Sequence, residues 1–84
     1  MDNRLTTLEI ALLKSITECD TLDGVDPVDH DVWAEEACYE FGKSAGGIMA
    51  SLAKKGFAGV QGSGAEATVW ITAEGFAALN QARG

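Results

Sequence analysis

The fold of this chain is decided by the segment Gly46-Gly-Ile-Met-Ala-Ser-Leu-Ala-Lys-Lys-Gly-Phe57, together with the later segment Val69-Trp-Ile-Thr-Ala-Glu-Gly75. The first predicts a helix that ends at Gly56, because glycine adopts the left-handed conformation that closes a helix, and Phe57 supplies the apolar contact that follows such an ending. The second predicts a strand and then a helix capped by Thr72. Between them, Gly62-Ser-Gly64 predicts a hairpin tip. The expected order is helix, strand, tight loop, strand, helix.

A further helix is expected near the start of the chain. Thr6-Thr-Leu-Glu9 fits a capping box, in which the threonine hydroxyl and the glutamate carboxylate each accept a backbone amide proton, so the helix should begin near Thr6. It should end near Cys19, where a polar segment with a turn signal at Asp23-Gly24 follows. The apolar stripe of this helix, at helical spacing, is expected to consist of Leu5, Leu8, Leu12, Leu13 and Ile16.

A second helix is expected to begin within Asp26-Pro-Val-Asp29, because aspartate is a good N-cap and proline suits the first helical position. Asp29 or Asp31 are alternative caps, and a short strand near residues 24–28 is compatible with the sequence but not required by it. The helix should run to about Tyr39, with Gly42 closing it or forming the next turn. Its expected buried residues are Val32 or Trp33, Ala37, and Cys38 or Phe41.

The third helix should begin with Ser44 as its N-cap. Its buried face is expected to consist of Ala45, Ile48, Met49 and Leu52. Strands are expected at residues 57–61 and 67–71, and the closing helix should bury Phe76 and Leu79. Trp33 and Trp70 are interpreted as core or wing-packing residues, and the alternative for Trp70 is an exposed interface position on a strand edge.

Length and composition favour a small binding or regulatory domain. The 84 residues are expected to form one domain, residues 1–84, whose single modest core leaves little room for a deep substrate cleft. No histidine, serine or cysteine arrangement fits a nucleophile and its base, so we expect no enzymatic activity. The first residues do not resemble a signal peptide and no apolar run is long enough to span a bilayer. We therefore expect a cytoplasmic protein with Cys19 and Cys38 as buried thiols, the alternative being a Cys19–Cys38 disulfide.

The net charge of −7 is unevenly distributed along the chain. Residues 41–65 carry Lys43, Lys54 and Lys55 and no acid. Residues 18–40 carry no lysine or arginine and nine acids: Glu18, Asp20, Asp23, Asp26, Asp29, Asp31, Glu35, Glu36 and Glu40. The sequence thus predicts an acidic body with one weakly basic patch, which coincides with the helix at residues 46–55.

The segments at residues 46–57 and 69–75 resemble the winged helix-turn-helix core of MarR-type and related small bacterial or phage regulators. The resemblance lies in Leu52-x-Lys-Lys-Gly-Phe57 and in Val69-x-Ile-Thr-x-Glu-Gly75, and it covers residues 30–80. It implies an α+β fold with three helices, a β-hairpin wing and a short C-terminal helix. Winged helices also serve as protein–protein modules, so the resemblance implies function only by analogy.

The resemblance implies that residues 44–55 form the recognition helix, whose N-terminal half would face the major groove of DNA. The residues expected to contact DNA are Lys43, Ser44, Ser51, Lys54 and Lys55. The sequence departs from a typical DNA reader in two respects. The helix has no arginine, asparagine or glutamine for bidentate contact with base edges, and the wing carries Glu66 where a basic residue is usual.

Two other sequence patterns have some features of binding sites. Ala37-x-x-x-x-Gly42-Lys43-Ser44 matches a relaxed phosphate-binding loop, but the residues before it are expected to be helical rather than a strand, so Gly42 is better interpreted as a turn and Ser44 as a cap. Cys19, His30 and Cys38 lack the paired close spacing of a zinc site, and the aspartates around Gly24 do not fit a calcium loop. No metal and no cofactor are expected.

Two functional hypotheses follow. The first is a winged-helix protein that binds double-stranded DNA as a homodimer and acts in transcriptional regulation, since two copies would double the number of phosphate contacts. The second is a protein-binding winged-helix module, or an acidic nucleic-acid mimic, that modulates a host complex. In the second, Glu35, Glu36 and Glu40 would carry the interaction with a basic partner.

Overall fold

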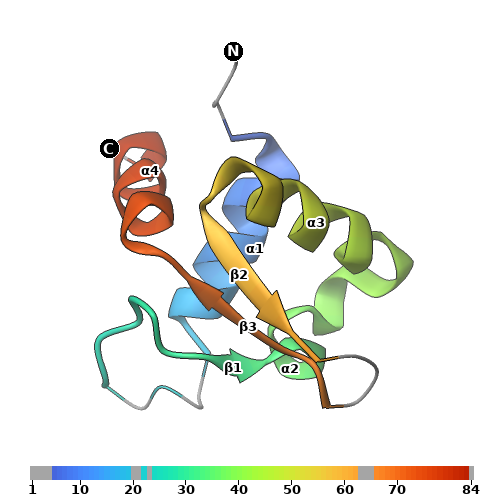
Figure 1. Ribbon diagram of the computed structural model, residues 1–84. Coiled ribbons are helices and arrows are strands. Elements are labelled where there is room, and N and C mark those ends of the chain that lie inside the picture. Colours follow the sequence, from blue (N-terminus) through green and yellow to red (C-terminus); the bar gives the residue numbers. More distant parts are fainter. Residues whose placement is uncertain (1–4, 20–21, 23, 63–65, 84) are drawn as a thin grey trace.

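In the described part of the chain, a helix comes first and is followed by further helical segments and short strands (Figure 1). The computed structural model describes residues 5–19, 22, 24–62 and 66–83. The elements in this part are, in order, α1 (Thr7–Thr17), β1 (Val32–Trp33), α2 (Ala34–Ala37), the 3-10 helix η2 (Tyr39–Ser44), α3 (Ala45–Lys55), β2 (Ala58–Gln61), β3 (Thr68–Ile71) and α4 (Ala73–Arg83). The described residues therefore form an α+β fold of four α-helices and one three-stranded sheet.

The sheet is antiparallel with the strand order β1-β3-β2. The predicted hairpin of β2 and β3 is confirmed, with Val60 opposite Val69, and β1 pairs with the other edge of β3, with Val32 also opposite Val69. At the expected hairpin tip, Gly62 is described and has a φ of 82°, whereas Ser63 and Gly64 lie outside the described residues. β1 comes before α2 and α3 in the chain, and it forms one edge of the sheet beside the later β2–β3 hairpin.

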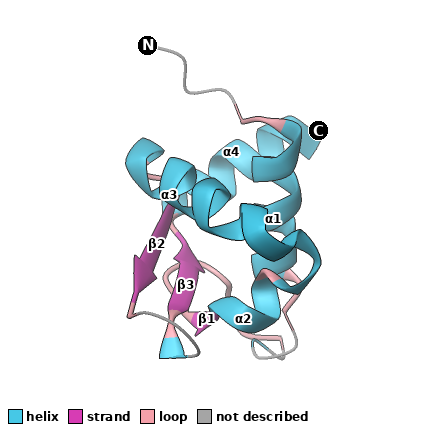
Figure 2. Cartoon of the chain, turned by 90° about the vertical axis from the view of Figure 1, so that its right-hand side faces the viewer, coloured by secondary structure: helices cyan, strands magenta, loops and turns pink. Residues whose placement is uncertain are grey.

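The helices lie on one side of this sheet, and the other side is uncovered by any described element (Figures 1 and 2). α1 packs against α3, α4 and β3, so it lies at the centre of the helical layer. The largest fully buried side chains come from α1 itself and from β1, α3, β3 and α4: Leu12, Leu13, Ile16, Val32, Leu52, Val69, Ile71 and Leu79. The single core predicted from the length of the chain lies between α1 and the inner face of the sheet.

The prediction for α1 is confirmed at both ends. Thr6 is the N-cap, its hydroxyl accepts the Glu9 amide proton, and the Glu9 carboxylate accepts the Thr6 amide proton, which together form the capping box. The helix ends at Thr17, close to the expected end. The expected stripe is wrong at Leu8, which is 53% exposed, whereas Glu9 is buried in its place. Glu9 lies three and four residues before Leu12 and Leu13, so it shares their face of the helix.

The prediction for the start of the second helix is wrong. No helix begins at Asp26, Asp29 or Asp31; instead the Asp26 carboxylate accepts the Val28 amide proton in a local turn, and Val28 forms an isolated parallel bridge with Ile71. α2 has only four residues, and Trp33 stands before it without a side-chain cap. The physical reason is that the backbone of residues 28–33 forms its hydrogen bonds with β3. The capping residues of this segment do not indicate such a distant partner.

The helix boundary at Gly56 is confirmed in detail. Gly56 has a φ of 81°, its amide donates to the Ala53 carbonyl, and the Phe57 amide donates to the Leu52 carbonyl, which is the hydrogen-bond pattern of a Schellman ending. At the other end, Ser44 precedes α3 as expected, but its side chain makes no capping hydrogen bond, because its backbone is already helical. The expected buried face is confirmed for Ala45, Ile48 and Leu52, and Met49 is half-buried.

The closing helix is fixed to the turn after α3. The Thr72 hydroxyl accepts the Gly75 amide proton at 3.0 Å, which confirms the predicted cap, and donates to the Gly56 carbonyl at 2.7 Å. A Cβ atom at Gly75 would lie 1.9 Å from the carbonyl oxygen of Phe57, so only glycine allows this approach. Leu79 is fully buried and Phe76 half-buried, as expected.

Two predictions on single side chains have different outcomes. Cys19 and Cys38 are both buried free thiols, so the alternative of a disulfide between them is wrong. Of the two interpretations of Trp33, as a core residue or as a wing-packing residue, the first is wrong, because its side chain is 51% exposed. In the described part of the chain, no helix is long and apolar enough to cross a membrane.

Candidate nucleic-acid interface

The outer surface of α3 is made of small residues with lysines toward its two ends. Ala45, Ile48 and Leu52 face the core, which leaves the opposite side of the helix to solvent. The exposed residues from the turn before α3 to its last turn are Gly42, Lys43, Ser44, Gly46, Gly47, Ala50, Ala53 and Lys54. This surface carries no carboxylate, in a protein whose net charge is −7.

Gly42 sets the direction in which the chain enters α3. Its φ of 56° and ψ of −131° interrupt the helical conformation within η2, shortly before α3 begins. Side-chain-bearing residues rarely adopt a positive φ, so glycine is the residue that allows the turn at this point. The kink places Lys43 and Ser44 at the solvent-exposed start of α3.

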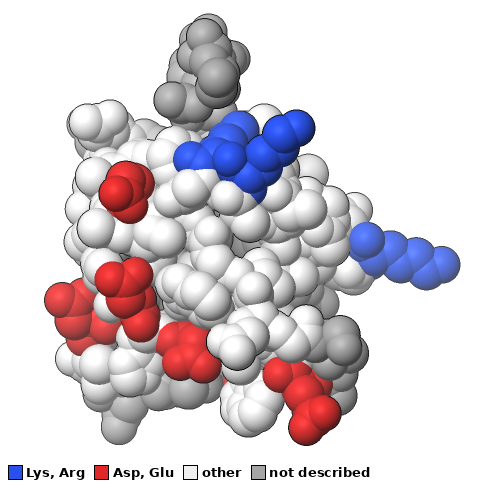
Figure 3. All heavy atoms as spheres, in the orientation of Figure 1, with Lys and Arg blue, Asp and Glu red and all other residues white. Residues whose placement is uncertain are grey.

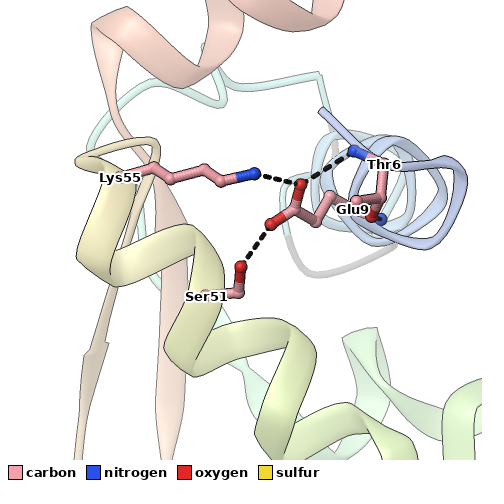
Figure 4. Close-up of polar contacts among 4 residues, drawn as sticks. All are labelled: Thr6, Glu9, Ser51 and Lys55. Carbon is pink, nitrogen blue, oxygen red and sulfur yellow. Dashed lines mark hydrogen bonds and ion pairs between the residues drawn. The ribbon is translucent and has the colours of Figure 1, made fainter. Parts of the chain in front are cut away.

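A buried carboxylate joins α1 to α3 (Figure 4). One oxygen of Glu9 accepts hydrogen bonds from the Thr6 amide at 2.8 Å and from the Lys55 ammonium at 2.7 Å, and the other accepts from the Ser51 hydroxyl at 2.5 Å. The Glu9 side chain is 3% exposed and that of Lys55 is 21% exposed. We call Thr6, Glu9, Ser51 and Lys55 the Glu9 cluster.

The Glu9 cluster holds its carboxylate in the charged form. Burial of Glu9 opposes ionisation, but the hydrogen bonds from Lys55, Ser51 and the Thr6 amide, with the positive charge of Lys55, outweigh it and lower the pKa of Glu9 from 4.5 to about 2. A buried ion that is fully hydrogen-bonded has one strongly preferred geometry. The cluster therefore fixes how α3 is oriented on α1, and with it the direction of the exposed surface of α3.

The five residues expected to contact DNA fall into two groups. Lys43, Ser44 and Lys54 are exposed on the outer surface of α3. Ser51 and Lys55 instead turn toward α1 and bind Glu9. The role of Glu9 across the two helices was missed from the sequence, although its position three residues before Leu12 was a signal that it lies on the buried face.

Charge is segregated over the surface (Figure 3). Basic side chains gather where α3 turns into β2 and at the far end of α3, whereas acidic side chains lie around β1, at the lower ends of the strands and over α4. Glu66, which follows the hairpin tip, is exposed. The basic surface is thus confined to α3 on the side that this figure shows.

The three glutamates of the alternative hypothesis lie on α2 and η2, and all are exposed. Glu35 lines a groove of about 630 Å³ between α2, α3 and the hairpin, whose other walls include Cys38, Met49 and Val60. The sulfur atoms of Cys38 and Met49 are 3.5 Å apart, and burial raises the pKa of the Cys38 thiol. Glu36 and Glu40 line a second groove, of about 610 Å³, between α1 and η2. Both grooves are open depressions next to exposed carboxylates.

The remaining site patterns have the following geometry. In the relaxed phosphate-loop pattern, Ala37 ends α2 and Gly42-Lys43-Ser44 lies within η2, so a helix and not a strand precedes the loop. Among the described residues, no group of histidine, cysteine, aspartate and glutamate side chains is close enough to hold a metal ion.

Comparison of the chain with protein-family models, with curated proteins and with solved structures gives no match in any of the three.

Proposed function

We propose that this chain is a winged-helix protein that binds double-stranded DNA through the outer surface of α3 and acts in transcriptional regulation. The observation that carries the proposal is the exposed, acid-free surface of α3, with Lys43 near its start and Lys54 near its end. Support also comes from the order of elements, in which α3 leads directly into a hairpin whose second strand pairs with an early strand β1. This order agrees with the resemblance to MarR-type regulators.

The dimensions of α3 suit a DNA groove. A helix of 11 residues is about 16 Å long, and the major groove is about 12 Å wide, so lysines at the two ends can reach phosphates on both sides of the groove. Between them, Gly46, Gly47 and Ala50 have almost no side chain, so the helix backbone can approach the DNA closely. Because these residues offer no bidentate donors, we propose a contact that reads phosphate positions and groove shape more than base edges.

Ser51 and Lys55 have a different role in this proposal from the one expected from the sequence. Because both bind Glu9, we assign them to positioning α3 and not to contacting DNA. One copy then offers few phosphate contacts, so binding as a homodimer in the cytoplasm remains part of the proposal.

The proposal is tested by titrating the isotope-labelled chain with duplex DNA at ~50 mM salt, where phosphate contacts are strong. We expect the amide resonances of residues 43–54 to shift and the affinity to fall steeply as salt is added. Lys43→Glu and Lys54→Glu should each weaken binding about tenfold or more, because each replaces an attraction to phosphate by a repulsion. Lys14→Glu, at an exposed position on α1, is the matched control and should retain more of the affinity. Unshifted resonances in residues 43–54 at saturating DNA would refute the proposal.

A second candidate function is supported by the two grooves beside the acidic residues. Glu35, Glu36 and Glu40 stand around Tyr39, whose side chain is 83% exposed, and next to the apolar groove that contains Met49. An exposed aromatic residue beside carboxylates suits a basic protein partner. Under this proposal, the chain is a protein-binding winged-helix module or an acidic nucleic-acid mimic.

A further inference from the structure

The open side of the sheet carries both tryptophans of the chain. Side chains on opposite strand positions point to the same side of a sheet, and neighbours along a strand point to opposite sides. Val32 and Val69 point into the core, so Trp33 and Trp70, each next to one of them, point to the open side. Trp33 is opposite Thr68, two residues before Trp70, so the two indoles occupy diagonal positions on adjacent strands.

Trp70 lies across the edge strand β2. It is opposite Gly59, and a Cβ atom at Gly59 would lie 2.2 Å from two carbon atoms of the Trp70 indole. The indole therefore occupies the space that a side chain at residue 59 would need, with one side against the β2 backbone. Trp70 is half-buried, and Trp33 is 51% exposed. Together with Thr68 and Gln61, these residues form what we call the tryptophan face.

The charges around the tryptophan face are negative. Asp31 is exposed two residues before Trp33, and Asp29 is exposed where its amide donates to the Ile71 carbonyl at the end of β3. Figure 3 views the molecule from this side: acidic atoms border the sheet near β1 and at the lower ends of the strands, and basic atoms are confined to the region of α3.

We propose that the tryptophan face binds an arginine-bearing segment of a partner protein. A guanidinium group is planar, so it can stack on an indole and at the same time pair with a carboxylate at the rim of the face. An indole presents its attractive negative potential on its ring face, and Trp33 leaves about half of its surface free for this contact. The site lies away from the outer surface of α3, so the inference is independent of DNA binding.

The same charges argue against a single-stranded nucleic acid as the occupant. Aromatic platforms that stack nucleotide bases are accompanied by basic residues that bind the phosphates. The tryptophan face has carboxylates at its border instead, which repel phosphates. Charge complementarity therefore favours a cationic protein segment.

The test uses the intrinsic fluorescence of the full chain, because both of its tryptophans lie on the proposed surface. A short peptide of alternating arginine and glycine should shift the emission saturably at ~50 mM salt. An oligothymidylate of similar length should leave the emission unchanged. Trp33→Ala, in which Trp70 remains as the reporter, should weaken peptide binding by about threefold or more.

Matched variants separate this site from general attraction to an acidic protein. Asp31→Asn should weaken peptide binding about twofold, whereas Glu40→Gln, with the same change of charge on η2, should change it less. Leu8→Ala removes an exposed apolar residue of α1, outside the tryptophan face, and should leave peptide affinity unchanged. Equal affinities of the native chain and Trp33→Ala, equal losses in Asp31→Asn and Glu40→Gln, or a saturable response to oligothymidylate but not to the peptide would overturn the proposal.

Discussion

At the scale of single residues, Glu9 has two tasks that come from the same carboxylate. It closes the capping box of α1 and it binds Ser51 and Lys55 of α3. The first task depends on a residue three positions away, and the second on residues 42 and 46 positions away. A local capping residue thus becomes the polar contact that joins two helices in the core.

We expect the stability of the protein to depend on Glu9 in acid. The folded pKa of Glu9 is below its ordinary value, so its contribution is complete above about pH 4.5 and is lost as the pH falls toward 2. A shift from 4.5 to about 2 corresponds to about 3 kcal/mol. Glu9→Gln should therefore lower the free energy of unfolding by about that amount near pH 7 and by much less near pH 2, measured by urea denaturation across this range.

Glu40→Gln is the control for this measurement, because Glu40 is exposed and makes no part of the Glu9 cluster. It should leave the free energy of unfolding near that of the native chain at both pH values. Equal stability of Glu9→Gln and the native chain at pH 7 would contradict the role assigned to the cluster.

At the scale of elements, the two ends of α3 differ in how well their backbone groups are capped. Its C-terminal end has the full hydrogen-bond pattern around Gly56, whereas its first turn contains Gly46 and Gly47 and no side-chain cap. Glycine in a helix is less favourable than alanine by about 0.5–1 kcal/mol. Propensity alone disfavours this first turn, and the two glycines fit the close approach of DNA that we propose for this surface.

Two glycine substitutions in α3 should have opposite effects on stability. Gly56→Ala should lower the free energy of unfolding by about 1 kcal/mol, because the φ of 81° is unfavourable for alanine. Gly47→Ala should raise it by about 0.5 kcal/mol, because its φ is not positive and no atom lies within 4 Å of the added Cβ. Thermal and urea denaturation measure both. If α3 binds DNA as proposed, Gly47→Ala should also weaken DNA binding while it stabilises the fold; a destabilised Gly47→Ala would contradict this account of the first turn.

At the scale of the whole molecule, the functions that we propose depend on where the charges are placed more than on their sum. The net charge of −7 would oppose DNA binding if it were spread evenly. The fold instead separates the lysines in the last turn of α3 from the carboxylates near β1 and the lower ends of the strands (Figure 3). The molecule thus has a surface suited to an anionic partner and others suited to cationic partners.

Charge reversal tests the second candidate function at this scale. A variant with Glu35, Glu36 and Glu40 replaced by lysine should recover a basic protein partner several-fold less well than the native chain when both are used as bait, since the new charges repel it. The matched control reverses the exposed Asp26, Glu66 and Glu74, which gives the same net charge. Unchanged recovery by the first variant, or equal loss in both, would count against binding through α2 and η2.

The sequence by itself determined the features that depend on residues a few positions apart. The capping box at Thr6, the ending of α3 at Gly56, the β2–β3 hairpin and the Thr72 cap each arise from neighbours along the chain, and each is present as predicted. Hydrogen bonds of this kind are specified by residue type and spacing alone.

Only the tertiary structure decided the features whose partners are distant in sequence. Residues 28–33 pair with β3, and this replaced the helix that their local caps predicted. Ser51 and Lys55 bind the buried Glu9 and not the exposed surface on which the sequence predicted them. The register of β1 places Trp33 on the open side of the sheet. The reason is that backbone groups and buried charges form hydrogen bonds with the partners that the fold brings near them. These partners are distant in sequence, so neighbouring residues do not predict them.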